Sequence, residues 1–111
     1  MEKLSGSNNT QLLNYANKYG TPLYVYDGDL IIERYNELKK FINWPKLKIL
    51  YAMKANYNVG ILNLLRENNA YLDTVSPAEV HLAIKLGFKK EDILYTANNI
   101  TNEEMHEVKK L

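Results

Sequence analysis

The most informative segment of the chain is Leu47-Lys48-Ile49-Leu50-Tyr51-Ala52-Met53-Lys54-Ala55-Asn56. Residues 47–53 are apolar enough to predict a strand, and the polar and glycine residues that follow, up to Gly60, predict a loop. Lys54 therefore lies where a strand passes into a loop. An amine held against an apolar strand end loses hydration, which favours its neutral, nucleophilic form. Lys54 is thus a candidate for attack on a carbonyl group, although a lysine in such a place more often just reaches solvent.

Helix-like and strand-like patterns alternate along the rest of the chain. The predicted helices are 10–19, 29–42, 59–68, 77–86 and 102–111, and the predicted strands are 22–26, 47–53, 70–75 and 93–96. Strands recur at intervals of about 22 to 26 residues, which predicts an α/β fold made of parallel βα units. No glycine-rich phosphate loop follows the first strand, so the pattern favours a barrel over a dinucleotide-binding sheet.

Four motifs occur in order along the chain. They are Tyr19 to Asp27 (YGTPLYVYD), Tyr51 to Asn56 (YAMKAN), Leu72 to Val80 (LDTVSPAEV) and Ala83 to Asn99, which contains AIKLGF and ILYTANN. Together they resemble the pyridoxal-phosphate-dependent enzymes with an alanine-racemase-like barrel, and within these the diaminopimelate decarboxylases. Several motifs in the family's order are far more specific than any one of them alone.

The resemblance implies that residues 1–111 are the N-terminal fragment of a pyridoxal-phosphate-binding (β/α)8 TIM-type barrel domain. A whole barrel of this kind takes roughly 250 residues. We therefore expect an incomplete barrel of about three and a half to four βα units. We also expect the predicted last helix to continue into further sequence, because no Gly or Pro terminates it.

The resemblance also implies a cofactor, pyridoxal 5'-phosphate, and three site residues. Lys54 would bind the cofactor aldehyde as a Schiff base. Ala52 would lie close to the cofactor, although a small residue also suits a crowded barrel interior. Asp73 interrupts an apolar strand, where a carboxylate is costly without a partner. The resemblance has it facing the lysine and the cofactor ring, with Lys54 as its ion-pair partner; otherwise a strand aspartate would face solvent or cap the next turn.

At two further positions, Glu79 and Thr96, the chain differs from the family's usual pattern or has a simpler structural explanation. Ser76-Pro77-Ala78-Glu79 has the pattern of a capping box, in which Glu79 reaches back to the amide of Ser76. We interpret Glu79 as a helix cap, although related enzymes carry a glutamate near the lysine. The family's usual Ser-Gly-Gly-Glu is replaced here, which removes backbone freedom at that turn. Thr96 begins a Thr-Ala-Asn-Asn segment where the family commonly has His-Gly-Asn.

The activity implied is decarboxylation of an amino acid, with meso-diaminopimelate converted to lysine as the favoured reaction and a homodimer as the assembly. Ornithine, arginine and carboxynorspermidine decarboxylases share the architecture and remain alternatives. So do a truncated homologue without catalytic activity, a binding module that uses the same surface, and a different enzyme in which Lys54 binds a phosphate.

Composition excludes several other classes. The chain has 14 basic and 13 acidic residues, a formal net charge of +1, which gives no electrostatic case for nucleic acid or a membrane surface. No apolar stretch approaches the ~20 residues of a membrane span, and no signal-peptide core follows Met1, so we expect a cytoplasmic protein. The chain has no cysteine, and its histidines, His81 and His106, are far apart in sequence. We therefore expect no disulfide framework and no metal site.

Overall fold

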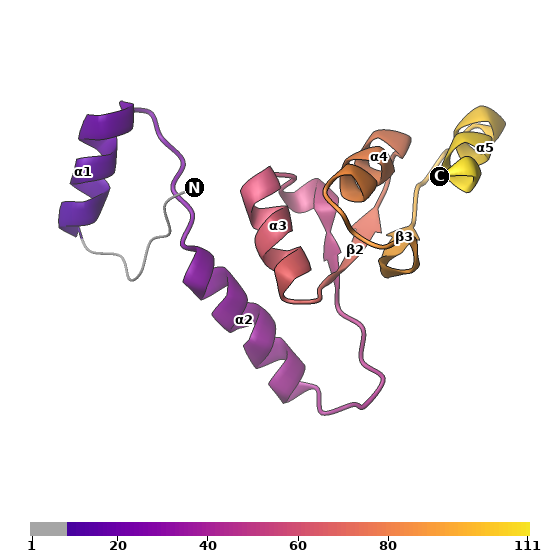
Figure 1. The fold of residues 1–111 in the computed structure, drawn as a ribbon, viewed down its shortest axis with the longest axis horizontal. Helices are drawn as coiled ribbons and strands as arrows, with labels where there is room; N and C mark the ends of the chain where they lie inside the picture. The colour runs from indigo at the N-terminus through magenta and orange to yellow at the C-terminus, as the bar shows by residue number, and fades with distance from the viewer. Residues whose placement is uncertain (1–8) are drawn as a thin grey trace. The chain divides into compact units, whose positions relative to one another are not determined.

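Helices and parallel strands alternate in the computed structural model, which describes residues 9–111 (Figure 1). Residues 1–8, where the absence of a signal-peptide pattern was noted, lie outside this range. The elements in chain order are α1 (Asn9–Tyr19), α2 (Gly28–Phe41), β1 (Leu50–Ala52), the short 3-10 helix η1 (Met53–Ala55), α3 (Val59–Glu67), β2 (Tyr71–Thr74), α4 (Pro77–Lys85), the 3-10 helix η2 (Lys90–Asp92), β3 (Ile93–Tyr95) and α5 (Asn102–Lys110).

The chain divides after Phe41 into two compact units. The first contains α1 and α2. Helix α1 ends at Tyr19, as predicted, and Gly20 follows it with a φ of 82°, a left-handed conformation that glycine adopts without strain. Helix α2 begins where the Asp27 carboxylate accepts a hydrogen bond from the backbone N–H of Leu30, at 3.0 Å. The residues at these helix ends, Gly20 and Asp27, are thus of types that commonly end or begin helices.

The predicted strand 22–26 is wrong. Residues of this segment are assigned to no strand, and their large side chains are exposed, with Tyr24 at 87%. Apolar and aromatic residues favour a strand because their side chains pack well on the surface of a sheet. A strand forms, however, only where a second strand supplies backbone hydrogen bonds. No other strand among residues 9–111 pairs with this one. The described chain therefore has three strands, not four.

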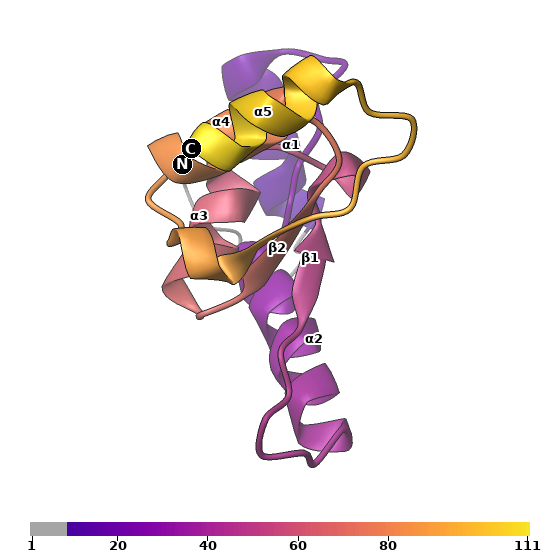
Figure 2. The same ribbon diagram turned by 90° about the vertical axis from the view of Figure 1, so that its right-hand side faces the viewer.

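The second unit, Ile42–Leu111, is built on a parallel sheet in the order β1-β2-β3. The strands β1 and β2 lie side by side in Figure 2, and each strand is followed by a helix. Tyr51, Leu72 and Ile93 form one row across the three strands. This row packs against α3 and α4. The core contains Met53, Leu62, Leu72, Ala83 and Phe88, with Tyr51, Leu82, Leu86 and Ile93 packed around it. The parallel α/β arrangement predicted from sequence is confirmed for this unit.

The turn after α4 shows how local sequence completes that core. Helix α4 ends at Leu86, and Gly87 adopts a φ of 88°. The left-handed residue lets the backbone N–H of Phe88 bond back to the carbonyl of Ala83, at 3.1 Å. Phe88 is consequently returned to the core, where it is 5% exposed. Any residue with a Cβ would be strained at position 87.

The opposite face of the sheet carries a different row of residues. Side chains alternate along a strand, so Ala52, Asp73 and Leu94, which are paired in register, lie on the face away from the helices. Leu94 is 50% exposed there. No helix among residues 9–111 is long and apolar enough to span a membrane.

Candidate active site

Lys54 lies directly beyond the carboxyl end of β1. The strand ends at Ala52 and the chain turns through η1, so Met53 is fully buried while Lys54 is exposed. The predicted loss of hydration at Lys54 is therefore wrong for this structure. The strand is shorter than predicted at this end, and the turn carries the amine away from the apolar core. Lys54 instead presents an accessible amine at the edge where the strands end.

The loop that follows Lys54 is organised by its own side chains. The hydroxyl of Tyr51 donates a hydrogen bond to the main-chain oxygen of Asn56, at 3.0 Å. The backbone N–H of Asn58 donates to Asn56 Oδ1, at 2.9 Å, and that of Gly60 donates to Asn58 Oδ1, also at 2.9 Å. The last contact caps α3. The tyrosine and the asparagine that begin and end the Tyr51–Asn56 motif are thus joined, and Lys54 lies within the closed turn.

Asp73 and Ala52 are direct neighbours on adjacent strands, paired in register on the face away from the helices. The carboxylate of Asp73 does not pair with Lys54: within residues 9–111, Oδ1 accepts a hydrogen bond from the hydroxyl of Thr96. The predicted ion pair between Lys54 and Asp73 is therefore wrong for this structure. Lys54 is exposed to solvent, and the hydroxyl of Thr96 satisfies the Asp73 carboxylate instead.

Thr96 is the site residue whose contact sequence reasoning missed. Its backbone N–H donates to the carbonyl of Thr74, at 2.9 Å, which continues the β2–β3 pairing one residue past Tyr95. On the adjacent strand, the buried hydroxyl of Thr74 donates to the carbonyl of Leu94, at 3.0 Å. The alternation that puts Leu94 beside Asp73 places Thr96 on the same face. Side-chain alternation along the strand is visible in the sequence, but it does not identify Asp73 as the neighbour of Thr96. That requires the register between β2 and β3.

Tyr95, the residue before Thr96, has the opposite environment. Its hydroxyl is buried and has no hydrogen-bond partner among the described residues. Desolvation raises the pKa of Tyr95, and the negative charges of Glu104 and Glu107 raise it further. The phenol therefore stays protonated at neutral pH, and it contributes no charge to the site.

Glu79 acts at the start of α4, in a slightly different way from the prediction. The predicted cap by Ser76 is confirmed, because its hydroxyl oxygen accepts from the backbone N–H of Glu79, at 3.3 Å. The Glu79 carboxylate accepts from the backbone N–H of Val75, at 2.7 Å, and not from that of Ser76. The predicted partner was one residue off. At α5 a full capping box forms between Thr101 and Glu104.

These contacts predict that Glu79 can be exchanged for glutamine at little cost. In the full-length protein, Glu79→Gln should keep nearly all activity and stability, because an amide oxygen can also accept from Val75. Glu79→Ala should lose about 0.5–2 kcal/mol of unfolding free energy with activity per folded molecule little changed. Thermal unfolding and steady-state kinetics measure both. Glu104→Gln and Glu104→Ala provide the matched control at the other box. A hundredfold loss of turnover in Glu79→Gln at unchanged melting temperature would instead assign its charge to the reaction.

The two histidines belong to helices, His81 to α4 and His106 to α5. His81 Nε2 lies 2.8 Å from Glu107 Oε1, which joins α4 to α5 at an exposed position. Among residues 9–111, no group of three or more His, Cys, Asp or Glu side chains is arranged to hold a metal ion. The groups at the carboxyl ends of the strands include the Lys54 amine, the carboxylates of Asp73 and Glu79 and the hydroxyl of Thr96.

Comparison of the amino-acid sequence with known protein families identifies the class of protein to which these residues belong. Residues 28–111 match the family described as "Pyridoxal-dependent decarboxylase, pyridoxal binding domain", and the chain belongs to this family. The match includes Lys54, Asp73 and Thr96, and it begins after the exposed segment 22–26. Pyridoxal 5'-phosphate is accordingly the cofactor of the family to which the chain belongs.

Individual proteins within this family are also similar to the chain. The chain is 43% identical over 95 residues to the diaminopimelate decarboxylase of Bacillus subtilis, and 39% identical over 92 residues to that of Methanothermobacter thermautotrophicus. These alignments cover 84% and 81% of this chain and 22% of each relative. The crystal structure of the diaminopimelate decarboxylase from Helicobacter pylori complexed with L-lysine superposes with a TM-score of 0.81 at 32% identity, covering 93% of this chain and 25% of that one. The chain thus spans about a quarter of the length of its relatives.

The described residues fit such a cofactor chemically. Lys54 offers an accessible primary amine, which is the group an aldehyde needs for covalent attachment. Beside it in the fold, the small side chain of Ala52 leaves room on the sheet face away from the helices, and Asp73 provides a carboxylate already oriented by a hydroxyl. All three groups occur at or near the carboxyl ends of β1 and β2.

Proposed function

We propose that residues 1–111 form the N-terminal part of a (β/α)8 barrel domain. Three parallel strands, each followed by a helix, support this proposal, together with helices packed on one face of the sheet. The other face carries Ala52, Asp73 and the half-exposed Leu94, as expected for a barrel interior to which the rest of the domain contributes. In such barrels the loops after the carboxyl ends of the strands form the active face, and Lys54 belongs to one of these loops.

Within that domain, we propose that Lys54 holds pyridoxal 5'-phosphate through its Nζ atom. The observation that carries the proposal is an accessible amine at a strand end inside the residues matched to the pyridoxal-binding family. Ala52 would leave space for the flat ring, and Asp73 would contribute a fixed negative charge beside it. When bound, the cofactor supplies an electron sink for the electron pair left on the α-carbon as carbon dioxide departs. Lys54 Nζ would hold the proton that returns to that carbon.

The proposed reaction of the full-length protein is the decarboxylation of meso-diaminopimelate to lysine. The supporting fact is that relatives with 39% and 43% identity are diaminopimelate decarboxylases. The proposal includes the homodimer that the resemblance implies and the cytoplasmic location expected from the sequence pattern. Size-exclusion chromatography with light scattering and cell fractionation test these two points.

A substrate panel tests the proposed reaction. Purified full-length protein supplied with pyridoxal 5'-phosphate is expected to release carbon dioxide and lysine from meso-diaminopimelate, with kcat/KM at least about tenfold higher than for ornithine or arginine. Borohydride reduction followed by peptide mapping should mark the peptide containing Lys54. Faster turnover of ornithine, arginine or carboxynorspermidine would reassign the substrate. A protein that binds the cofactor but decarboxylates none of them would be a non-catalytic homologue.

A further inference from the structure

We propose that Thr96 is a positioning residue for Asp73, and that it fixes the carboxylate in the orientation the cofactor site requires. The inference rests on the proposed function of Lys54 and Asp73. Its basis is the hydrogen bond from the Thr96 hydroxyl to Asp73 Oδ1, between side chains 23 residues apart in the chain.

The position of Thr96 is fixed by the sheet and not by its side chain. Its backbone N–H is bonded to the carbonyl of Thr74 at 2.9 Å, directly beyond the register pair of Thr74 and Tyr95. Asp73 is itself held between Ala52 and Leu94 by the ladders on both sides. Two backbone-anchored residues therefore present a donor and an acceptor to each other across β2 and β3. This is the support that keeps a functional group in one rotamer.

The chemistry of the contact leaves part of the carboxylate available. An ionised aspartate has two acceptor oxygens, and Thr96 occupies Oδ1. A carboxylate held at one oxygen keeps a defined direction for the other. Without the hydroxyl, the Asp73 side chain would be free to rotate and its charge would be spread over several positions.

Stability alone does not account for the contact. Thr96 is exposed, and a hydrogen bond at an exposed site contributes little to the free energy of unfolding, because water replaces it when it breaks. A functional role through Asp73 and a purely structural role therefore differ in what they predict. The first affects cofactor affinity at constant melting temperature, whereas the second affects the melting temperature first.

Four variants of the full-length protein test the inference: Thr96→Val, Thr96→Ser, Asp73→Asn and the double variant Thr96→Val/Asp73→Asn. Valine keeps the β-branched shape and removes only the hydroxyl. The readouts are the dissociation constant of pyridoxal 5'-phosphate, titrated into apoenzyme by fluorescence quenching, the cofactor absorbance maximum, kcat/KM and the melting temperature. Thr96→Val is expected to weaken cofactor binding about tenfold, as for loss of a hydrogen bond to a charged group. Thr96→Ser should stay within about twofold of the parent.

The double variant supplies the decisive comparison. If Thr96 acts through Asp73, Thr96→Val should cause no further loss in the Asp73→Asn background. Normal cofactor binding in Thr96→Val, or the same loss in both backgrounds, would overturn the inference. So would a lowered melting temperature that the serine variant does not restore. If Asp73→Asn weakens binding while Thr96→Val does not, the proposed site stands and only this inference falls. If the parent binds no cofactor, the proposed function falls with it.

Discussion

Replacing Lys54 with alanine in the full-length protein is expected to abolish the borohydride-stable adduct with pyridoxal 5'-phosphate and to reduce decarboxylation by roughly three orders of magnitude or more. The variant loses both the covalent attachment of the cofactor and the group proposed to return the proton. Because Lys54 is exposed in a turn outside the core, its removal should leave the melting temperature nearly unchanged. Absorbance of the bound cofactor, peptide mapping after reduction and steady-state rates measure these three effects.

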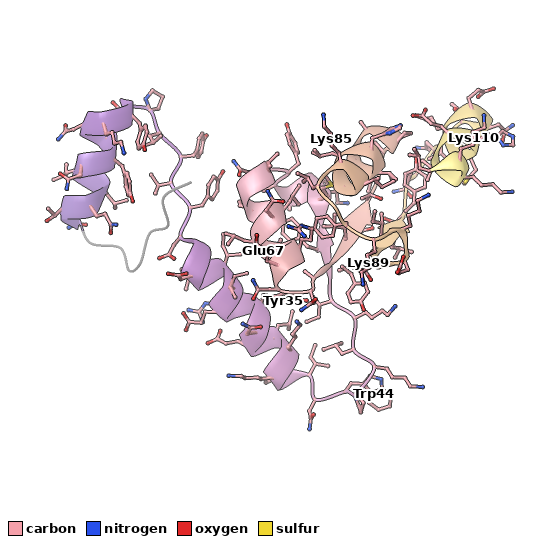
Figure 3. The ribbon with its side chains drawn as sticks, viewed as in Figure 1. Tyr35, Trp44, Glu67, Lys85, Lys89 and Lys110 are labelled. Atoms are coloured by element: carbon pink, nitrogen blue, oxygen red, sulfur yellow. The ribbon has the colours of Figure 1, made fainter. Side chains whose placement is uncertain are left out.

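Two further lysine variants define what the amine does. Lys54→Arg keeps a positive charge, but a guanidinium stays protonated and cannot form the adduct, so it should be as inactive as Lys54→Ala. Lys85→Ala is the matched control, since Lys85 is an exposed lysine of α4 that projects from the helix in Figure 3. It should behave like the parent. Near-normal turnover in a variant lacking the Lys54 amine would refute the assignment, and phosphate binding without an adduct would favour the alternative role of Lys54.

The elements of the second unit could be predicted from sequence because their signals are local. Helix α3, predicted as 59–68, was found as Val59–Glu67, with Asn58 as its cap. Its apolar residues Ile61, Leu62 and Leu65 are all buried. Caps, glycine stops and apolar periodicity all lie within a few residues of the element they delimit. Such signals do not depend on the remainder of the fold.

Strand lengths could not be predicted in the same way, because a strand depends on its partner. The apolar run 47–53 predicted seven residues, but only Leu50–Ala52 form β1. Its partner β2 begins at Tyr71, which is paired with Leu50, so the residues before Leu50 extend past the start of that strand. At the other end, η1 removes Met53 from the ladder. The segment 22–26 failed for the same reason, since it has no partner among the described residues.

Sequence reasoning named candidate residues for the site but did not predict which of them contact one another. The family resemblance pointed to Lys54, Ala52 and Asp73, and whether these residues bind the cofactor remains a prediction. The partner of Asp73 depends on the register between β2 and β3, which no local pattern specifies. Sequence reasoning therefore treated Thr96 only as the absence of a histidine, whereas the structure gives its hydroxyl a carboxylate partner.

The described core also bears on how residues 1–111 should behave when made alone. Five side chains form the central cluster, on one face of a three-stranded sheet. Large apolar side chains are exposed elsewhere, among them Phe41 at 90%, Tyr24 at 87% and Trp44 at 67%, the last on the segment between α2 and β1 (Figure 3). Neither β1 nor β3 pairs with a further strand among the described residues, so both offer open edges. Exposed apolar surface and open edges both promote association between chains.

We therefore expect the isolated segment to have no detectable decarboxylase activity and to associate or remain dynamic in solution. The relatives are more than four times the length that the chain covers, so the isolated segment lacks most of the sequence that the relatives have. Release of carbon dioxide measures the activity, and size-exclusion chromatography and amide spectra measure the association and dynamics, with the full-length protein as the control. A soluble monomer with sharp, dispersed amide signals and cooperative unfolding would contradict the expectation. Such a result would establish the segment as an autonomous domain and would favour the binding-module alternative over the enzyme.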